Sequence, residues 1–599
     1  MTHSKLLLEL RSPAKTRLGK RLLRALRAGA DRLIGRRELT VFHHSSYRLP
    51  LSGLELTLSI EPRRAELAVW SLSHFGALLP KGLHIPEPAS YRQLSLVHTD
   101  EYLDSLSRPE VLARIFAAEP SEIAPDELLL AVRLACGGTV EGARLALAKG
   151  VPVLNTLGGF HHAGRGRGGG LSALNDVAVA VAVLRREGFT GRIVVLDLDA
   201  HPPDGTAECL RPFDNVWIGS LSGSNWGQLQ RVDEMVLPEG CADSEYLRAL
   251  DGLLARMPRP ELAFVNAGGD VLAGDRFGLL RLSLDGVRER DGRVLRALGV
   301  GTASVWTPGG GYQPDAWRAL VGTGLVLAGR VNRRIPSDYD PLTSHFLDIA
   351  ASTNLGERRN EPFLNQRQLD DVVAKRMPET STLLGYSKEA LQYALFHYGL
   401  AAHLERLGYR HFRVELEVIG EEDRFRVYGE SVGKEYLLIE AFVSRQPISG
   451  EQYLFVNWLA LRDPRAQFTP QRPRLPGQDV PGLGLAREIS ELFAIVAQRR
   501  GLRGVAFRPS WYHLAYAARR RARFIDVERQ ARFEALVRDM SKMSLLEATN
   551  AIADGRVRLN GQVYQWEADN MVYQLADAPN TDASSRAASG AYHFTVEPH

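Results

Sequence analysis

The sequence has little cysteine, no long apolar run and almost no net charge. Its three cysteines, Cys136, Cys209 and Cys241, are widely spaced and odd in number, which excludes a disulfide framework and a CxxC zinc site. No stretch approaches the roughly 18 consecutive apolar residues that a membrane-spanning helix requires, and no signal-peptide core is present. The net charge of +4 gives no overall signature of nucleic-acid binding. These absences predict a cytoplasmic protein without a transmembrane segment.

What is present is the length and composition of a large globular protein. The 599 residues are 45% hydrophobic and 24% charged, which is enough to form several domains with sizeable cores. Shifts in composition divide the chain into five segments. They are a basic N-terminal arm (1–38), an α/β domain (39–335), a charged linker with several prolines (336–387), a smaller α+β domain (388–575) and a flexible tail of small polar residues (576–599).

The N-terminal arm is strongly basic. Residues 5–37 contain eleven Lys and Arg against only Glu9 and Asp31, and leucines recur near helical spacing. A basic amphipathic helix of this kind could bind an anionic partner such as a lipid surface, a nucleic acid or an acidic protein. A solvated arm, or a helix packed on its own domain, explains the same pattern, so the arm predicts no particular partner.

Apolar runs alternate with helical stretches from residue 39 to residue 335. This alternation predicts an α/β fold in which helices cover both faces of a parallel sheet. The expected strands are 39–43, 151–157, 193–196, 215–220, 262–266 and 303–306, and the expected helices are 61–79 (with Pro62 in the first turn), 126–149, 175–187 and 315–329.

Four of these strands are followed directly by residues that can carry chemistry. The stretch RIVVLDLDAHPPDG (192–205) is the richest, and Asp199 and His201 stand two apart in it, so on a strand they point to the same side. The other three strands lead into glycine-rich turns and then His161-His162, Asp270 or Tyr312. Because ligands bind at the carboxyl ends of strands in such sheets, we expect these side chains to converge on one site.

The residue types at these strand ends predict a metal site. Asp199, His201 and Asp270 could supply three ligands and leave a fourth position for water and a substrate oxygen, which is the arrangement of a catalytic zinc site. Asp–x–Asp–x–His alone is also common at polar strand ends, so the prediction rests on the convergence of several motifs.

Acid–base groups accompany the predicted metal ligands. His161 and His162 lie on a loop, where both can point into one pocket and exchange protons near pH 7, and Asp197 and Asp204 could orient them. Tyr312 follows three glycines and could donate its hydroxyl to an oxyanion, although this pattern alone is more typical of a turn. Together these groups predict metal-assisted hydrolysis of an amide.

The motifs, taken in order, resemble those of the zinc-dependent histone deacetylases of the arginase/deacetylase superfamily over residues 39–335. The matching blocks are GGFHHAGRGRGGGLSALND (158–176), DLDAHPPDG (197–205), AGGDVLAGDRFG (267–278) and GGGYQ (309–313). The Gln after the tyrosine and the DLDAH sequence look most like the class IV branch. The resemblance implies the three-layer parallel-sheet fold of that superfamily and removal of an acetyl or longer fatty acyl group from a lysine peptide or protein.

The resemblance also implies a role for individual residues. It places Zn²⁺ on Asp199, His201 and Asp270. It makes His161 and His162 the general base and acid pair, supported by Asp197 and Asp204, and uses Tyr312 to polarise the acyl carbonyl. The substrate tunnel would be lined by Gly170, Leu171 and Gly310. A structural K⁺ near Asp197 and Ser220 is implied as well.

Three departures from the family pattern affect the surroundings of the site. Leu171 stands where a phenylalanine is usual, so the tunnel wall is expected to be aliphatic and wider. Pro202 and Pro203 replace a His/Gln-Gly pair and remove backbone donors, and Ala173 replaces an aromatic residue. Since no predicted ligand is lost, we expect the site to be active.

The second domain contains one further motif. DVPGLGLAREISELF (479–493) follows a predicted strand and opens a helix, and it resembles the pyrophosphate loop of the GNAT acyltransferases, in which Gly482 and Gly484 would approach coenzyme A. Asp479 stands where that family has Gln or Arg, which weakens the attraction for phosphate. The expected elements are helices at 389–407, 485–499 and 512–521 and strands at 411–418, 425–428, 436–443, 453–461 and 504–507.

Other functions fit parts of the sequence. An amidohydrolase acting on acetylpolyamines or other small acylated amines would use the same site. A catalytically weak scaffold, or an acyl-CoA-binding protein, would act through residues 388–575 instead. A binuclear manganese ureohydrolase is disfavoured, because that variant of the fold needs additional Asp and His ligands.

Overall fold

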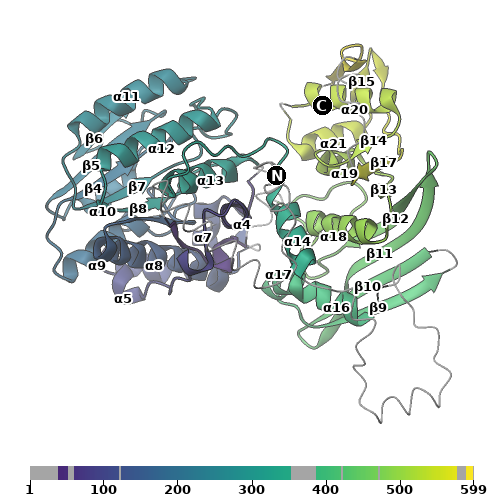
Figure 1. The fold of residues 1–599 in the computed structure, drawn as a ribbon, viewed down its shortest axis with the longest axis horizontal. Helices are drawn as coiled ribbons and strands as arrows, with labels where there is room; N and C mark the ends of the chain where they lie inside the picture. The colour runs from purple at the N-terminus through teal and green to yellow at the C-terminus, as the bar shows by residue number, and fades with distance from the viewer. Residues whose placement is uncertain are drawn as a thin grey trace, which may run out of the picture. The chain divides into compact units, whose positions relative to one another are not determined.

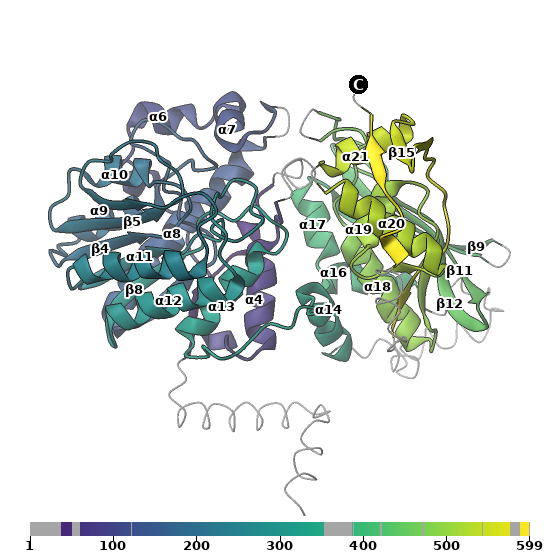
Figure 2. The same cartoon turned by 90° about the horizontal axis from the view of Figure 1, so that it is seen from above.

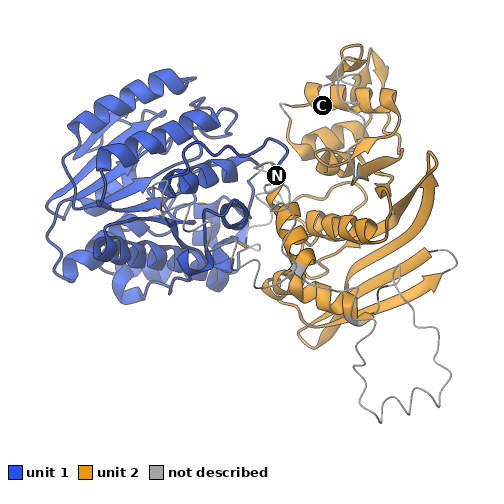
Figure 3. Ribbon diagram, viewed as in Figure 1, with its two compact units in different colours: residues 1–49, 60–339 blue, residues 50–59, 340–599 orange. Residues whose placement is uncertain are grey.

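The computed structural model describes residues 38–50, 60–120, 123–352, 386, 388–419, 422–469, 472–541, 543–575 and 588–597. The chain forms two compact units, residues 1–49 with 60–339 and residues 50–59 with 340–599 (Figure 3). The predicted basic arm lies outside the described residues, apart from Glu38. Among the helices described, none is long and apolar enough to cross a membrane.

The first unit contains an eight-stranded sheet in which every neighbouring pair is parallel. In spatial order its strands are β2 (Leu83–His84), β1 (Thr40–Phe42), β3 (Pro152–Asn155), β8 (Ala303–Thr307), β7 (Leu262–Asn266), β4 (Ile193–Asp197), β5 (Val216–Ser222) and β6 (Val232–Val236). Every residue of β3, β4, β7 and β8 is buried, as expected for apolar strands covered on both faces.

Helices cover both faces of this sheet and form the outer two layers (Figures 1 and 2). Helices α8 (Pro125–Lys149) and α9 (Asp176–Arg186) pack together on one face, and α11 (Asp243–Arg256), α12 (Leu284–Leu298), α13 (Ala316–Leu327) and α4 (Arg64–His74) cover the other. The shorter helices are η1 (Ser45–Tyr47), η2 (Pro80–Gly82), α5 (Tyr91–Leu94), α6 (Asp100–Ser105), α7 (Pro109–Phe116) and α10 (Asp204–Leu210). This architecture confirms the predicted three-layer α/β fold.

Local sequence explains where the main helices begin. Asn175 caps α9 by accepting a hydrogen bond from the Ala178 amide, and the apolar sequence that follows is buried from Asp176 to Leu184. Helix α4 begins at Arg64, later than predicted, and Pro62 lies in the preceding turn. Strand β6 and helices α11 and α12 were not predicted, because β6 is a half-buried edge strand and both helices are rich in charge.

The second unit is built on a seven-stranded mixed sheet. Its strand order is β14-β17-β13-β12-β11-β10-β9, and β12 and β13 are its parallel pair, while the other neighbours are antiparallel. The strands are β9 (Arg410–Ile419), β10 (Glu422–Ser431), β11 (Lys434–Ile448), β12 (Glu451–Leu461), β13 (Gly504–Phe507), β14 (Arg523–Phe524) and β17 (Met571–Gln574). A three-stranded sheet adds β16 (Gln562–Val563), β15 (Val557–Leu559) and β18 (Phe594–Val596).

Helices accompany these strands in an α+β arrangement, as predicted. They are α14 (Pro341–Ser352), α16 (Lys388–His397), α17 (Leu400–Arg406), α18 (Ala486–Arg499), α19 (Tyr512–Ala518), α20 (Val527–Asp539) and α21 (Leu545–Ala553). The single helix predicted over 389–407 is two helices, because Gly399 adopts a positive φ of 76° between them.

Two predicted segments of irregular structure contain regular elements. Helix α14 lies within the predicted linker 336–387 and packs against α18, with Leu342 and Phe346 buried; residues 353–385 lie outside the described part. Strand β18 lies within the predicted flexible tail 576–599, where it pairs with β15 and buries Phe594. The tail prediction is therefore wrong at β18, since pairing with a distant strand cannot be read from its polar surroundings.

Candidate metal and acid–base site

The carboxyl ends of β4 and β7 bring together the three predicted metal ligands. The ligand atoms of Asp199, His201 and Asp270 all lie within 4.8 Å of one another. His201 Nδ1 lies 3.1 Å from Asp199 Oδ1 and 3.0 Å from Asp270 Oδ2. Two carboxylates that are 1% and 0% exposed are costly to bury without a cation between them. The donor set, two carboxylates and one imidazole, therefore fits a divalent metal such as zinc.

The electrostatics of the three groups agree with this fit. Burial alone would lower the pKa of His201, but the hydrogen bonds to Asp199 and Asp270 outweigh it and raise this pKa to about 11. Burial and the neighbouring charge of Asp199 raise the pKa of Asp270 to about 7. The site thus attracts a positive charge, which a metal ion would supply in place of a proton.

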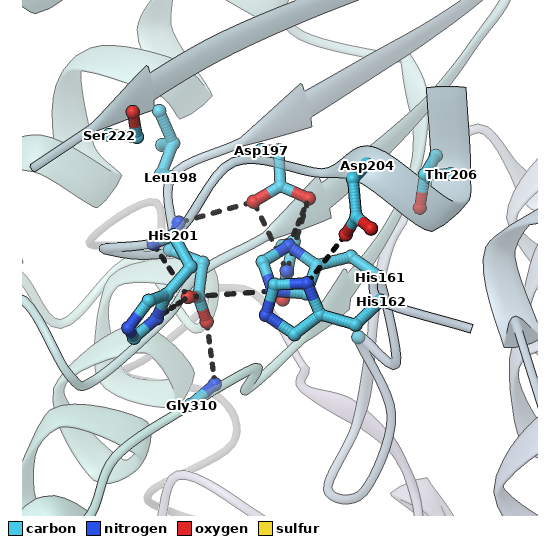
Figure 4. A network of polar contacts seen from close by, with 12 residues as sticks. His161, His162, Asp197, Leu198, His201, Asp204, Thr206, Ser222 and Gly310 are labelled. Atoms are coloured by element: carbon cyan, nitrogen blue, oxygen red, sulfur yellow. Dashed lines mark hydrogen bonds and ion pairs between the residues drawn. The ribbon is translucent and has the colours of Figure 1, made fainter. Parts of the chain in front are cut away.

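Backbone amides of two adjacent loops fix the carboxylates. Gly310 donates its N–H to Asp199 Oδ2 at 2.7 Å (Figure 4). Ala200 donates its N–H to Asp270 Oδ1 at 3.0 Å. A Cβ at Gly310 would lie 2.5 Å from Asp270 Oδ2, so this close approach requires glycine. Gly310, predicted to contact substrate, lies against the predicted ligand Asp199.

The tandem histidines lie beside this group, each with its own carboxylate. His161 Nδ1 is 3.0 Å from Asp197 Oδ2, His162 Nδ1 is 2.7 Å from Asp204 Oδ1, and the two ring centroids are 4.1 Å apart (Figure 4). Burial would lower the pKa of His161, but Asp197 and Asp199 outweigh it and raise this pKa to about 9. Burial and the adjacent His161 lower the pKa of His162. One imidazole therefore favours its charged form and the other its neutral form.

Two arginines that sequence reasoning missed support the loops of the site. Arg167 donates to Asp204 Oδ2 at 3.0 Å and to Glu208 Oε2 at 3.2 Å, so it orients the carboxylate behind His162. Arg64, the first residue of α4, donates to the carbonyls of Gly309 and Gly310 at 2.8 Å each. Arg167 lies inside the block 158–176 but was given no role there, whereas Arg64 lies outside every motif and some 245 positions from Gly309, so the sequence offered no signal for it.

Tyr312 is held next to the predicted ligands by the loop that follows β7. Its N–H donates to Asp275 Oδ2 at 2.7 Å, and its ring meets Phe277 edge-on with centroids 5.0 Å apart. Burial and the charges of Asp199 and Asp270 raise the pKa of Tyr312 well above its ordinary value. The hydroxyl therefore stays protonated and can act as a donor.

The residues around the histidines are partly apolar. Trp226, which is 53% exposed, stacks on His162 at a centroid distance of 5.1 Å and lies 6.0 Å from the His201 ring. Leu171 adopts a positive φ of 61°, and a Cβ at the preceding Gly170 would lie 2.4 Å from the His162 ring. Trp226 follows no motif, so it was not predicted.

The two prolines that depart from the family pattern fit the local structure. Pro202 and Pro203 are buried, and Asp204 donates its N–H to the Pro202 carbonyl at 3.0 Å before α10 begins at Asp204. Because Pro203 is the N-cap of α10 and Pro202 precedes it, the missing N–H groups of the pair cost the helix no hydrogen bond.

Comparison with known proteins decides the family. The profile of the histone deacetylase domain matches residues 59–325. Histone deacetylase 2 of Arabidopsis thaliana is 32% identical over 300 residues, which cover 47% of this chain and 77% of that protein. The chain belongs to the histone deacetylase family.

Two further relatives are less identical to the chain. Histone deacetylase RPD3 of Saccharomyces cerevisiae is 28% identical over 254 residues, covering 38% of this chain and 58% of that protein. The crystal structure of an HDAC homolog from Aquifex aeolicus has 23% identity and a TM-score of 0.42, and the match covers 56% of this chain and 93% of that one. The histone deacetylase domain ends at residue 325, so it does not include the second unit. The first unit is thus a hydrolase domain of the deacetylase type.

Proposed function

We propose that the protein is a zinc-dependent lysine deacylase. The observation that carries the proposal is the juxtaposition of three metal-binding side chains, Asp199, His201 and Asp270, with a histidine pair whose members have separate carboxylate partners. When bound, zinc would polarise the amide carbonyl and lower the pKa of the attacking water.

The chain's own residues supply the proton transfers. Neutral His162 accepts a proton from the attacking water, and Asp204 stabilises the imidazolium that results. Tyr312 donates a hydrogen bond to the carbonyl oxygen as negative charge develops on it. When the C–N bond breaks, His162 returns the proton to the lysine Nζ, which leaves as an amine. The acyl group leaves as a carboxylic acid, which then passes its remaining proton to the amine. Charged His161 stays beside Asp197 and stabilises the same negative charge.

The surroundings of the site favour an acyl chain over a polar substrate. Trp226 and Phe277 are 53% and 41% exposed, so large apolar side chains remain accessible beside His162 and Tyr312. Such surfaces mark binding sites for apolar groups. We therefore propose an acylated lysine of a peptide or protein as substrate, with Leu171 leaving room for a chain longer than acetyl. The class IV assignment stays a prediction.

Hydrolysis of matched peptides tests this function. The zinc-loaded protein is given one lysine peptide carrying acetyl, octanoyl or myristoyl, beside Tyr312→Phe and, as a matched control, Tyr91→Phe, whose ring is 51% exposed. We expect cleavage that is lost in Tyr312→Phe and kept in Tyr91→Phe. No cleavage of any peptide, together with cleavage of acetylated polyamines, would replace the proposal by small-amide hydrolysis.

A monovalent cation is proposed between the neighbouring strands β4 and β5, near Asp197 and Ser220. Ser220 stands opposite Asp197 in the β4–β5 pairing, and within the described structure its buried hydroxyl has no hydrogen-bond partner. A K⁺ ion would satisfy this oxygen and part of the charge of Asp197. We expect catalytic activity to depend on K⁺ in the wild type and to depend on it less in Ser220→Ala.

A second candidate function concerns coenzyme A in the second unit. The carbonyls of Pro481, Gly482 and Leu483 each accept a hydrogen bond, from the Asp463 amide, Arg472 and His403. In the described contacts the amides of residues 482–484 donate none, and they precede the N-terminus of α18, where backbone donors favour phosphate. The loop lies in the connection between β12 and α18, and β12 pairs in parallel with β13.

Binding of coenzyme A by the full chain tests this second candidate. Isothermal titration would give a measurable affinity that falls in Gly484→Glu, whose carboxylate repels phosphate. No heat with the wild type would leave the second unit as an interaction domain.

A further inference from the structure

Helix α12 contains an arginine whose side chain is 0% exposed and that reaches both loops carrying the predicted metal ligands. Arg290 donates from one guanidinium nitrogen, Nη1, to the Gly268 carbonyl at 2.7 Å and to the Leu198 carbonyl at 3.3 Å. Leu198 directly precedes the ligand Asp199, and Gly268 lies two residues before the ligand Asp270. A single group on a helix outside the sheet thus contacts the backbone at the ends of β4 and β7.

A hydrogen bond to a second buried residue, Asp291, holds the guanidinium group of Arg290 in place. Its Nε donates to Asp291 Oδ1 at 2.8 Å, and Asp291 Oδ2 accepts the hydroxyl of Thr323, on α13, at 2.6 Å. Arg290 and Asp291 are both 0% exposed. A planar guanidinium has donors in fixed directions, whereas an ammonium does not, so lysine could not span the carboxylate and the two carbonyls with the same geometry.

The position of these contacts points to a role beyond packing. Burying an ion pair is costly, and an apolar pair of similar size would often be as stable. What an apolar pair could not do is tie two neighbouring loops to each other through their carbonyls. His201 Nδ1 lies about equally far from Asp199 and Asp270, so the separation of these loops sets the size of the metal site.

We propose that Arg290 is a positioning residue for the metal site, which holds the Asp199 and Asp270 loops at the separation that a divalent ion requires. The inference rests on the proposed metal-binding role of Asp199, His201 and Asp270. Partners of metal ligands commonly contribute about 10- to 100-fold to metal affinity. We expect losses in this range for Arg290→Met and for Arg290→Lys. The lysine variant keeps a positive charge beside Asp291, so it remains a usable test if the methionine variant does not fold.

Metal affinity and cobalt spectra test the proposal without relying on activity. Zn²⁺ affinity is measured by competition with a chromophoric chelator, and the Co²⁺-substituted proteins are compared by visible absorption, which reports ligand geometry. The matched controls are Arg288→Met and Arg288→Lys, because Arg288 lies on the same helix, is 8% exposed and donates to the Val331 carbonyl instead. We expect weaker Zn²⁺ binding and an altered Co²⁺ spectrum for the Arg290 variants only.

Two results would overturn the proposal, and they differ. If the Arg290 variants melt at a lower temperature but bind Zn²⁺ as tightly as the wild type, with the same Co²⁺ spectrum, Arg290 only stabilises the fold. If the wild type and Asp270→Ala are equally unable to bind Zn²⁺, the proposed function fails as well, because the three ligands then do not form a metal site.

Discussion

At the scale of single residues, the two histidines differ in pKa because their neighbours differ. His161 lies near two carboxylates, at 3.0 Å from Asp197 and 3.6 Å from Asp199, whereas His162 pairs with Asp204 at 2.7 Å and has a charged ring beside it. The arrangement keeps His162 neutral and able to accept a proton. The distinction cannot be read from the sequence, in which the two residues are adjacent and chemically identical.

His162→Ala is therefore expected to remove the proton acceptor while leaving the metal ligands intact. General acid–base catalysis by one group typically contributes about 10²- to 10⁴-fold, so kcat should fall by this factor while KM and Zn²⁺ affinity change little. Steady-state kinetics with an acyl-lysine peptide and a chelator competition measure both. A larger loss of kcat in His161→Ala than in His162→Ala would reverse the assignment.

Leu171 combines a strained backbone with a position directly after Gly170, whose backbone approaches the His162 ring. Because its φ is positive, Leu171→Gly should relieve strain and raise the melting temperature slightly, whereas Leu171→Phe keeps the strain and adds volume. We expect Leu171→Phe to lower the ratio of kcat/KM for myristoyl-lysine to that for acetyl-lysine several-fold. An unchanged ratio in both variants would show that Leu171 does not line the acyl path.

At the scale of helices and strands, periodicity predicted the elements whose burial is one-sided or complete. Helix α9 and strand β4 were predicted to within a few residues, because an almost uninterrupted apolar run has to be buried in the protein core. Helix α12 was missed since charged residues, Arg288, Arg290 and Asp291, also occupy its buried face and break the apolar pattern. Strand β18 was missed since a three-residue strand depends on a partner, β15, far away in the sequence. The site followed the same rule: groups in strand-end motifs were predicted, and isolated ones such as Arg64 and Trp226 were not.

Helix α14 offers a test at this scale, because its start depends on one side chain. Asp340 Oδ1 accepts the amides of Leu342 and Thr343, and Oδ2 binds Arg487 of α18 at 2.8 Å. Burial would raise the pKa of Asp340, but Arg487 and the helix amides outweigh it and lower this pKa. Since the folded form binds the proton more weakly, the stabilisation is present above the unfolded pKa of about 4 and is lost as the pH falls below it.

Asp340→Ala should thus lower the free energy of unfolding of the second unit by about 1 kcal/mol at pH 7, the usual effect of removing an N-cap. The difference from the wild type should shrink as the pH falls below about 4, because the carboxylate of the unfolded chain is protonated there first and that of the folded chain at lower pH. Urea unfolding at several pH values measures it, with Asp348→Ala, an exposed residue of the same helix, as control. A difference that is the same at pH 3 and pH 7 would mean that the charge of Asp340 does not stabilise α14.

At the scale of the whole molecule, the chain consists of two units that have separate sheets and separate candidate sites. All three predicted metal ligands belong to the first unit, and the loop proposed for coenzyme A belongs to the second. A ligand that binds only the folded state stabilises the unit that binds it, by about 4 kcal/mol at 1,000 times its dissociation constant. The two ligands should therefore act on different unfolding transitions of the same chain.

Calorimetry of the full-length protein measures this directly. Removal of zinc by a chelator should lower the melting temperature of one transition and leave the other unchanged, since only the first unit loses the ion that offsets the repulsion between Asp199 and Asp270. Asp270→Asn, which removes a ligand and one of these charges, should no longer respond to the chelator. Coenzyme A should shift only the transition that the chelator leaves unchanged. One transition that moves as a whole with zinc would show instead that the two units unfold together, and the metal would then stabilise the entire chain.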